Sequence, residues 1–197
     1  MKTLLRIDTS IRVHESISRT IGDHFVSLWL RKYPNGKIIS RDLHANPIPH
    51  LTESTVRAFF NGDTTNDGLA MSDELIGEIN QCDSLLITCP MYNYQIPSSL
   101  KAYFDHIVRS NKTFQYKNGE YVGLIKNKKC FIVTAMGGKN SGTDLGEGFN
   151  KYLQNILGFV GITDVVMFSI EGTAQPEFGI EVLNDTKRKI TESLDKL

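Results

Sequence analysis

The chain has 197 residues, of which 40% are hydrophobic and 22% charged, and its formal net charge is zero. This length and composition predict one globular domain over residues 1–197 with a substantial apolar core. The zero net charge argues against a nucleic-acid surface. No apolar stretch has the length of a signal peptide or a membrane span, so we expect a cytoplasmic protein that binds neither nucleic acid nor membrane.

The three cysteines, Cys82, Cys89 and Cys130, are odd in number and lack CxxC spacing. They therefore indicate neither a disulfide framework nor a zinc site, and we expect no metal. Cys89 and Cys130 fall within apolar runs, which predicts buried thiols rather than reactive ones.

Apolar runs of strand length alternate with helical patterns along the chain. The runs are Leu4–Ile7, Lys37–Ile39, Ser84–Cys89, Lys129–Thr134 and Asp164–Phe168. Helical patterns cover Ser18–Arg31, Met71–Gln81, Ser98–Arg109, Asp144–Gly158 and Pro176–Leu197. Strict alternation predicts an α/β protein with a parallel sheet covered by helices on both faces. Five strands of this kind fit a flavodoxin-like, doubly wound fold with strand order 2-1-3-4-5.

Two segments are longer than the connections of that fold require. Leu43–Asn66 contains Pro47 and Pro49, and a loop of this length is usually functional or part of an interface. Thr113–Gly123 alternates around an Asn-Gly pair and predicts a small β-hairpin.

The first candidate site loop follows the first strand and runs from Asp8 to Ser18. Ser10 closes the strand, while Ser16 and Ser18 open the next helix. A helix N-terminus offers free N–H donors and a positive dipole, to which the serines add neutral hydroxyl donors, so the loop predicts a phosphate site without lysine. Neither GxxxxGK[ST] nor GxGxxG is present. The alternative is simple N-capping by Ser16 or Ser18.

The second loop follows the third strand, which Pro90 ends. Met91, Tyr92, Asn93 and Tyr94 are displayed on this turn. The aromatic rings are suited to flank a planar heterocycle, and Asn93 to bond its edge. The alternative is that both tyrosines cover the core.

The third loop, Thr134–Gly138, follows the fourth strand. Gly137 and Gly138 remove side chains, so that backbone N–H groups can approach a ligand. The alternative is an ordinary glycine-rich turn. Because the carboxyl ends of parallel strands share one edge of the sheet, the three loops should meet there and form a flavin mononucleotide (FMN) site. A response regulator would need clustered acids after the first strand, where only Asp8 is suitably placed.

With these residues identified, the chain resembles the FMN-dependent NADH-azoreductases, which are flavodoxin-like quinone reductases. The resemblance covers nearly the whole chain. It rests on the Ser10, Ser16 and Ser18 spacing and on the segments RDLHANPIP (41–49), PMYNYQIPSSLKAYFD (90–105), KTFQYKNG (112–119), TAMGG (134–138) and LGFVGITDV (157–165).

The resemblance implies a homodimer with one FMN per subunit at the interface. The implied FMN contacts are Ser10, Ser16, Ile17, Ser18, Met91, Tyr92, Asn93, Tyr94, Ala135, Met136, Gly137 and Gly138. Relatives often place Ser-Arg before the paired glycines, whereas this chain has Ala135-Met136. Backbone contacts survive that change, but a side-chain hydroxyl bond is lost. Ile17 likewise implies a backbone contact.

The implied activity is hydride transfer from NADH to quinones and aromatic azo compounds by a ping-pong mechanism. No catalytic side chain is expected, because the flavin carries the chemistry and Asn93 supports its N5 edge. Phe114, Tyr116 and Phe159 are candidates for lining the substrate side. Two alternatives remain: an electron-transfer flavodoxin, against which the zero net charge counts, and a non-catalytic flavin-binding module.

Overall fold

The computed structural model describes residues 1–175 and 178–197, and its centre is a five-stranded parallel sheet in the order β2-β1-β3-β6-β7. The strands are β1 (Thr3–Asp8), β2 (Lys37–Asp42), β3 (Ser84–Pro90), β6 (Lys129–Ala135) and β7 (Asp164–Ile170). Two further strands, β4 (Phe114–Lys117) and β5 (Glu120–Gly123), form a separate antiparallel hairpin. Since β6 and β7 are the fourth and fifth strands of the parallel sheet, the predicted flavodoxin-like order 2-1-3-4-5 is confirmed.

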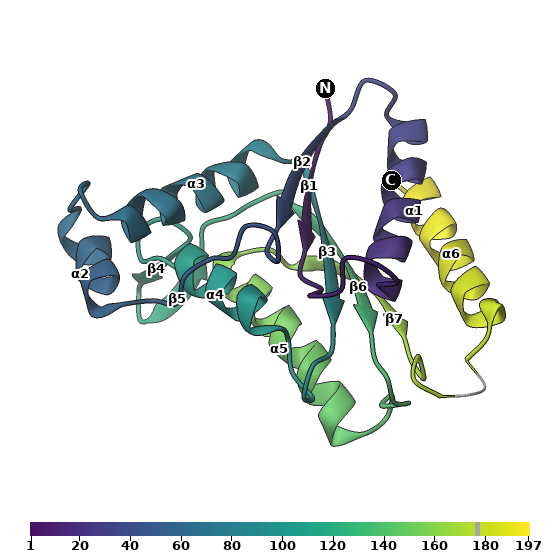
Figure 1. Cartoon of the computed structure of the whole chain (residues 1–197). Helices are drawn as coiled ribbons and strands as arrows, with labels where there is room; N and C mark the ends of the chain where they lie inside the picture. Colours follow the sequence, from purple (N-terminus) through teal and green to yellow (C-terminus); the bar gives the residue numbers. More distant parts are fainter. Residues whose placement is uncertain (176–177) are drawn as a thin grey trace.

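Helices cover both faces of this sheet (Figure 1). On one face lie α1 (Ile17–Lys32) and α6 (Ile180–Asp195), and on the other lie α3 (Asp67–Gln81), α4 (Ser98–Ile107) and α5 (Asp144–Val160). Each face has its own apolar core, one centred on Phe25, Trp29 and Phe131 and the other on residues such as Tyr103 and Phe149. The doubly wound arrangement therefore leaves the strand ends free for binding.

The central strands are mostly apolar because both of their faces are buried. β3 (SLLITCP) and β6 (KCFIVTA) each have a single partly exposed residue at their first position, and β6 has one more at its last. Gly22 lets α1 approach this layer closely, since a Cβ at that position would lie 2.6 Å from the Cγ2 atom of Thr88 in β3. The second turn of α1 therefore packs closely against the centre of the sheet.

Helix ends differ from the prediction where capping residues decide them. α3 begins at Asp67, four residues before Met71, because the Asn66 side chain accepts a hydrogen bond from the Leu69 N–H at 3.2 Å. The predicted start of the last helix at Pro176 lies outside the described residues, and the described helix begins at Ile180.

The long segment between β2 and α3 contains a helix that the sequence analysis did not predict, α2 (Glu53–Asn61). It lies beyond the edge of the sheet (Figure 1). The Phe59 ring lies 4.8 Å from the guanidinium carbon of Arg109, whose Nη1 donates to Asp73 at 2.6 Å. This contact fixes α2 to the end of α4 and to α3.

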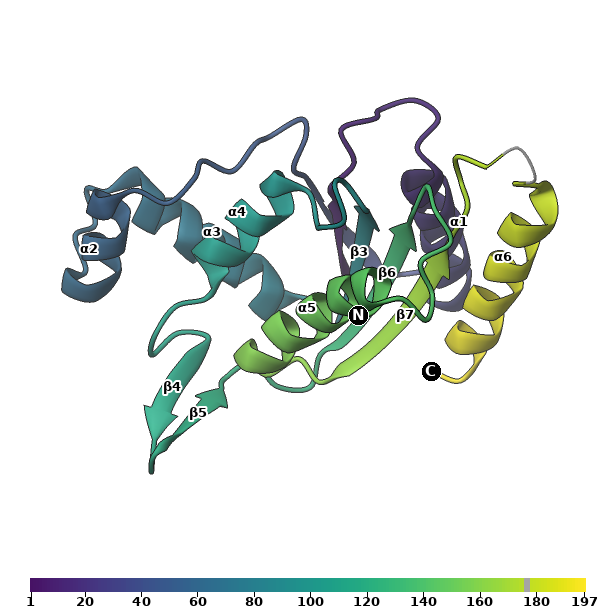
Figure 2. The ribbon, with the colours of Figure 1, turned by 90° about the horizontal axis from the view of Figure 1, so that it is seen from below.

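The predicted hairpin is confirmed and projects from the body of the molecule (Figure 2). Its two central residues, Asn118 and Gly119, have φ angles of 54° and 88°. These positive values are those of a two-residue hairpin turn that matches the strand twist. A backbone bond from Ile125 to the Val160 carbonyl ties the base of the hairpin to the end of α5.

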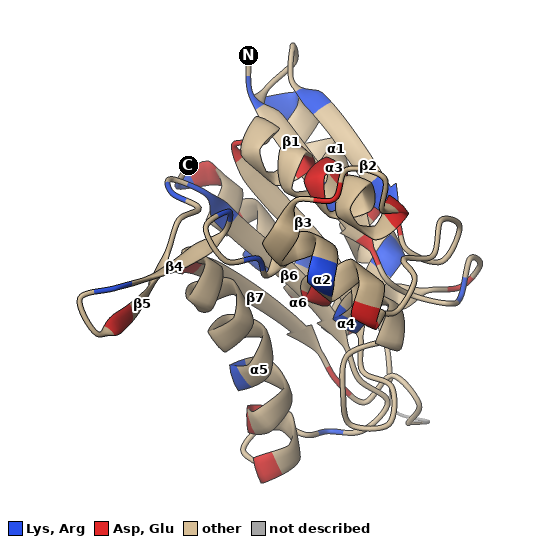
Figure 3. Cartoon of the chain, turned by 90° about the vertical axis from the view of Figure 1, so that its left-hand side faces the viewer, with Lys and Arg blue, Asp and Glu red and all other residues tan. Residues whose placement is uncertain are grey.

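Charged residues of both signs are interspersed on the side of the molecule shown in Figure 3, in keeping with the zero net charge. Within residues 1–175 and 178–197, no helix has the length and apolar character needed to cross a bilayer.

Two glycines end helices in the left-handed conformation, and they provide a test of the packing at the base of the hairpin. Gly161 ends α5 with φ 104°, and a Cβ there would overlap the carbonyl oxygen of Ile125. Gly62 ends α2 with φ 72° and has open space around it. We expect Gly62→Ala to cost about 1–2 kcal/mol, and Gly161→Ala to cost about 1–3 kcal/mol more through overpacking. Urea unfolding of both variants measures the difference, and equal costs would contradict the packing described here.

Candidate active site

Four loops meet at the carboxyl edge of the sheet, following β1, β3, β6 and β7 (Figure 1). They enclose a cavity of about 340 Å³, within the range of small-molecule sites. Its lining residues are Ser10, Arg12, Ser16, Ile17, Ser18, Pro90, Met91, Tyr92, Ala135, Gly137, Thr173 and Ala174. The convergence that the sequence predicted for three loops is therefore present, with a fourth loop added.

The serine loop combines the two interpretations that the sequence left open. Ser16 is the N-cap of α1, and its Oγ accepts a hydrogen bond from the Arg19 N–H at 3.4 Å. Its other neighbour is the Ser18 Oγ at 3.3 Å, and both serines are buried. Both contacts are long for hydrogen bonds that involve a hydroxyl. Within the described part of the chain, the N–H groups of Ile17 and Ser18 have no acceptor. The loop therefore caps the helix and still offers donors to an anion.

Tyr92 braces this loop with its hydroxyl group. The Tyr92 OH lies 3.3 Å from the Ser10 Oγ and accepts a hydrogen bond from the Ile11 N–H at 3.3 Å. The alternative that both tyrosines cover the core does not hold, because Tyr94 is 57% exposed and Tyr92 is partly buried at the cavity wall. The two aromatic rings thus have different functions, one in bracing the serine loop and one at the surface.

The turn that carries Asn93 and Tyr94 is strained. Tyr92 and Gln95 exchange two backbone hydrogen bonds of 2.8 and 3.0 Å, and between them Asn93 and Tyr94 have φ angles of 50° and 62°. In a turn of this kind glycine has no steric cost, and a tyrosine does. Among the described residues, the N–H groups of Asn93 and Tyr94 have no acceptor. Strain of this kind gathers at ligand-binding sites, so the turn points to a ligand that uses these donors.

The glycine turn after β6 is held from behind by the loop after β7. The carbonyls of Met136, Gly137 and Gly138 accept hydrogen bonds of 3.0–3.2 Å from residues 172–174. The Met136 side chain is fully buried in the core. Within the described residues the N–H groups of Gly137 and Gly138 have no acceptor, which leaves them available to a ligand.

The structure places the twelve predicted cofactor-binding residues in three groups. Eight of them line the cavity: Ser10, Ser16, Ile17, Ser18, Met91, Tyr92, Ala135 and Gly137. Asn93 lies in an adjoining hollow of about 860 Å³, which Met91 and Tyr92 also line. The other three do not line the cavity: Tyr94 is exposed, Met136 is in the core, and Gly138 follows Gly137 on the same turn.

Four lining residues were not predicted from the sequence: Arg12, Pro90, Thr173 and Ala174. Thr173 and Ala174 could have been predicted, because Gly172-Thr173-Ala174 follows the fifth strand of the sheet. Ligands in this fold bind beyond the carboxyl ends of the strands, and this loop lies at one of those ends. Arg12 is the one arginine or lysine among the cavity-lining residues.

The three predicted substrate residues are close to one another and do not line either hollow within one chain. Phe114 and Phe159 have ring centroids 4.7 Å apart, and Tyr121 connects them to Tyr116 at 5.1 Å. This aromatic cluster lies at the hairpin and the end of α5, away from the carboxyl edge (Figure 2).

A network of two arginines and three aspartates lies beneath the serine loop: Arg6, Arg19, Asp8, Asp23 and Asp42. Arg6 Nε contacts Asp8 at 2.9 Å, and the Arg19 guanidinium donates to both carboxylate oxygens of Asp42 at 2.7 and 2.9 Å. The Arg19 hydrogen bond lowers the pKa of Asp42 to about 2, helped by the backbone N–H groups of His44 and Ala45. The same bond raises the pKa of Arg19.

The cysteines are buried, as predicted for Cys89 and Cys130. Burial raises the pKa of Cys82 to about 11 and raises the pKa of Cys89 and Cys130 further above the usual range. All three are therefore protonated at neutral pH and poor nucleophiles.

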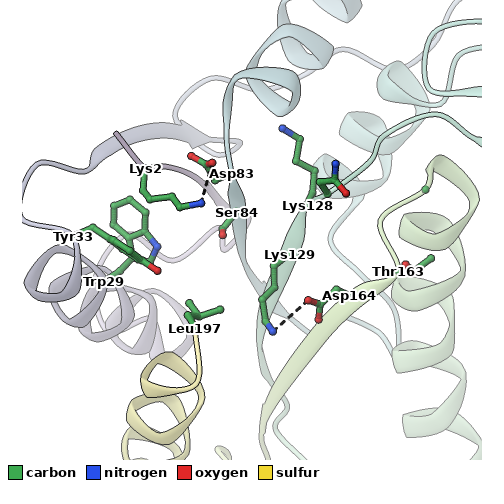
Figure 4. Close-up of a pocket in the computed structure, with 12 residues that line it drawn as sticks. Lys2, Trp29, Tyr33, Asp83, Ser84, Lys128, Lys129, Thr163, Asp164 and Leu197 are labelled. Carbon is green, nitrogen blue, oxygen red and sulfur yellow. Dashed lines mark hydrogen bonds and ion pairs between the residues drawn. The ribbon is translucent and has the colours of Figure 1, made fainter.

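A second polar hollow, of about 500 Å³, lies at the opposite, amino edge of the sheet (Figure 4). Its lysines are already engaged: Lys2 pairs with Asp83 and Lys129 with Asp164, each at 3.3 Å, and Lys128 donates to the carbonyls of Asn80 and Cys82. Carboxylates compensate two of these charges and carbonyl oxygens hold the third ammonium group, so the hollow leaves little free positive charge for an anion.

The carboxyl-edge site fits FMN in its donor chemistry. The α1 N-terminus and the serine hydroxyls match a phosphate group. The free N–H groups of Asn93, Tyr94, Gly137 and Gly138 match the carbonyl and ring-nitrogen edges of a planar heterocycle. Ser10, Ser16 and Ser18 would hold the phosphate, and the two turns would hold the ring edges.

Comparisons with known proteins agree with this assignment. The sequence profile of a family described as having the flavodoxin-like fold matches residues 1–194. A relative named FMN-dependent NADH:quinone oxidoreductase, from Marinomonas sp. (strain MWYL1), is 39% identical, with 96% of this chain and 98% of the relative covered. A relative with the same name from Xanthobacter autotrophicus (strain ATCC BAA-1158 / Py2) is 41% identical, with 84% of each chain covered.

Solved structures show the same fold. An azoreductase from Bacillus anthracis str. Sterne superimposes with a TM-score of 0.90 over the whole of both chains, at 24% sequence identity. An FMN-dependent NADH-azoreductase from Bacillus anthracis str. Ames Ancestor, solved in complex with FMN, superimposes with a TM-score of 0.87 at 24% identity, covering 100% of this chain and 99% of that one. By its sequence relatives and its fold, this chain belongs to the family of the FMN-dependent NADH:quinone oxidoreductases, within the flavodoxin-like fold.

Proposed function

We propose that this protein is an FMN-dependent oxidoreductase that transfers reducing equivalents from NADH to quinones and aromatic azo compounds. The observation that carries the proposal is the strained Asn93–Tyr94 turn, whose free N–H groups stand beside the cavity formed by the serine loop. The names of the relatives supply the electron donor and the quinone acceptor, and the names of the solved structures supply the azo acceptor.

The bound cofactor supplies the two-electron chemistry, and the protein positions it. Ser10, Ser16 and Ser18 would hold its phosphate, together with the N–H groups of Ile17 and Ser18. The Asn93 turn would donate to the N5 edge of the ring, and Gly137 and Gly138 would donate to the N1/O2 edge. Fixed N–H dipoles of this kind stabilise negative charge as it develops, without reorganisation.

The active assembly is a homodimer with one FMN per subunit. Its support is the exposed aromatic surface, which includes Phe60 at 80%, Tyr116 at 65% and Tyr121 at 64% exposure. A monomer rarely leaves so many large rings in water. In a two-fold pairing, the aromatic cluster of one chain, with Phe114, Tyr116 and Phe159, walls the substrate side of the partner's cofactor. We place the protein in the cytoplasm, where free thiols such as its three buried cysteines persist.

The purified protein is expected to be yellow and to contain FMN rather than FAD. One phosphate-binding loop is present at the cavity, and the adenylate half of FAD has no second one among the lining residues. Denaturation followed by chromatography of the released flavin identifies the cofactor. Recovery of mainly FAD, or of no flavin, would overturn the proposed cofactor.

Steady-state assays with NADH and a quinone test the activity itself. An oxidoreductase oxidises NADH in proportion to the quinone consumed. An electron-transfer flavodoxin or a flavin-binding module would contain FMN and show no such turnover.

A further inference from the structure

Arg19 spans the two ends of the serine loop. It is the third residue of α1, and its backbone N–H donates to the Oγ of Ser16 at 3.4 Å. Its guanidinium reaches back across the loop, where Nη2 donates to the carbonyl oxygen of Ser10 at 2.8 Å. Arg19 thus connects Ser10, where the loop begins, to Ser16, where it ends.

The loop itself has little else to hold it. Residues 11–15 are exposed and outside any helix or strand. Within the described residues, the loop's own contacts are the Arg12 N–H donating to the Ser10 Oγ at 3.2 Å and the Ile11 N–H donating to the Tyr92 OH at 3.3 Å. Glu15 at its end has a positive φ of 56°, a conformation that most residues avoid. The two Arg19 hydrogen bonds, to Ser10 and Ser16, therefore reduce the conformational freedom of the loop before any ligand binds.

The Arg19 guanidinium is itself held in place by Asp42. The two groups make a bidentate pair at 2.7 and 2.9 Å, a geometry that fixes the plane of the guanidinium. Asp42 in turn accepts hydrogen bonds from the N–H groups of His44 at 2.9 Å and Ala45 at 3.2 Å, at the start of the long segment that leads to α2. The Arg19 side chain is only 12% exposed.

The charge of Arg19 is already compensated. Asp42 is its bidentate partner, and Asp8 lies 3.6 Å from its Nη1. Asp8 is also held by Arg6 at 2.9 Å and by the Thr88 hydroxyl at 2.7 Å. Arg6 also pairs with Asp23 at 2.6 Å, so three aspartates face the two arginines, and attraction between Arg19 and a phosphate is largely cancelled. Arg19 therefore acts by fixing the shape of the loop and not by attracting the phosphate.

We propose that Arg19 is a positioning residue that holds the serine loop closed in the conformation that receives the FMN phosphate, with Asp42 fixing its guanidinium. The proposal rests on the proposed function, since it assumes that the loop binds this phosphate. It follows that Arg19 governs the preference for FMN over riboflavin, which has the same ring and no phosphate. A residue that only supported the fold would affect both flavins alike.

The experiment compares the two flavins directly. Purified full-length protein is incubated with excess equimolar FMN and riboflavin, separated from free flavin by gel filtration, and its bound flavins are quantified by chromatography. In Arg19→Gln the bound FMN-to-riboflavin ratio is expected to fall about tenfold, as for loss of one hydrogen bond to a charged group. Arg19→Lys keeps the positive charge and much of the packing. A lysine ammonium cannot reproduce the planar guanidinium, which donates to Ser10 and Asp42 at the same time. The FMN-to-riboflavin ratio should therefore fall in this variant too.

Arg41→Gln is the matched control. Arg41 lies next to Asp42 and is similarly buried, with 13% of its side chain exposed, and it pairs with Glu74 and Glu78 of α3. Its loss is expected to lower the urea midpoint and leave the flavin ratio unchanged. A wild-type protein that binds both flavins equally would contradict the phosphate role of the loop, and with it the proposed function. A wild type that prefers FMN, with both Arg19 variants keeping that preference, would overturn the role of Arg19 alone.

Discussion

Replacing Ser16 and Ser18 together by alanine is expected to weaken FMN binding by a factor on the order of a hundred or more. A hydrogen bond to a charged group contributes about 1.5–3 kcal/mol, and two hydroxyls are lost. Both hydroxyls are buried at the cavity, and their contacts within the protein are long, at 3.3–3.4 Å, so a phosphate oxygen can replace them at small cost. Flavin fluorescence during titration of the flavin-free variant measures the affinity.

The double variant also loses the N-cap of α1, so its melting temperature should fall as well. Thr52→Ala is the control for that loss, because Thr52 caps α2 with a 3.2 Å bond from the Thr55 N–H and does not line the cavity. An N-cap contributes about 1 kcal/mol, so Thr52→Ala should reduce stability without changing FMN affinity. If the double variant did the same, the serines would be capping residues and nothing more.

The proposed homodimer predicts that activity requires dimerisation, because the three candidate substrate rings do not line the site within one chain. The cavity and the adjoining hollow are not lined by Phe114, Tyr116 or Phe159, and these rings lie at the hairpin and the end of α5. Specific activity should therefore fall on dilution in step with the dimer fraction measured by analytical ultracentrifugation. Donor and acceptor would use the same open face in turn, which predicts parallel lines in double-reciprocal plots. Intersecting lines would contradict the shared face.

Complementation between two impaired variants tests the proposed shared site, at an FMN concentration too low to load the serine variant. One partner carries Ser16→Ala with Ser18→Ala, and the other carries Phe60→Ala with Tyr116→Ala. A mixed dimer has one site with an intact serine loop and an intact partner surface, so random mixing should restore about a quarter of wild-type activity. A mixture that stays inactive, or a monomer with full activity, would contradict a site built from two chains.

The order of strands and helices was predictable because each element has a clear local pattern. β3 and β6 are mostly apolar over their whole length, and α1 begins at a serine N-cap and presents Phe25 and Trp29 to the core. α2 was not predicted because its stability comes from tertiary contacts: only Thr55 and Ala58 of its residues are buried, and Arg109 at the end of α4 holds Phe59. A short helix of this kind has a weak local signal.

The candidate site was predictable at the level of loops and less so at the level of side chains. The serine loop, the Asn93 turn and the Gly137 turn were predicted to meet because each follows the carboxyl end of a parallel strand. The same rule does not show that the Tyr92 hydroxyl braces Ser10, or that Met136 faces the core, because these depend on the direction of single side chains. Arg19 was invisible for another reason: its partner Asp42 is 23 residues away, and nothing in the local sequence joins them.

The left-handed pair Asn93–Tyr94 also bears on how this protein can be stabilised. Glycine at either position would relieve backbone strain of about 1–2 kcal/mol per residue, so a screen for thermal stability would tend to select it. Glycine at position 93 would also remove the Asn93 side chain from beside the cavity, and glycine at either position would make the turn more flexible. Glycine at these two positions would therefore raise thermal stability and, at the same time, weaken the geometry that holds the cofactor. A thermostabilised form of this enzyme is best obtained by changes elsewhere in the fold.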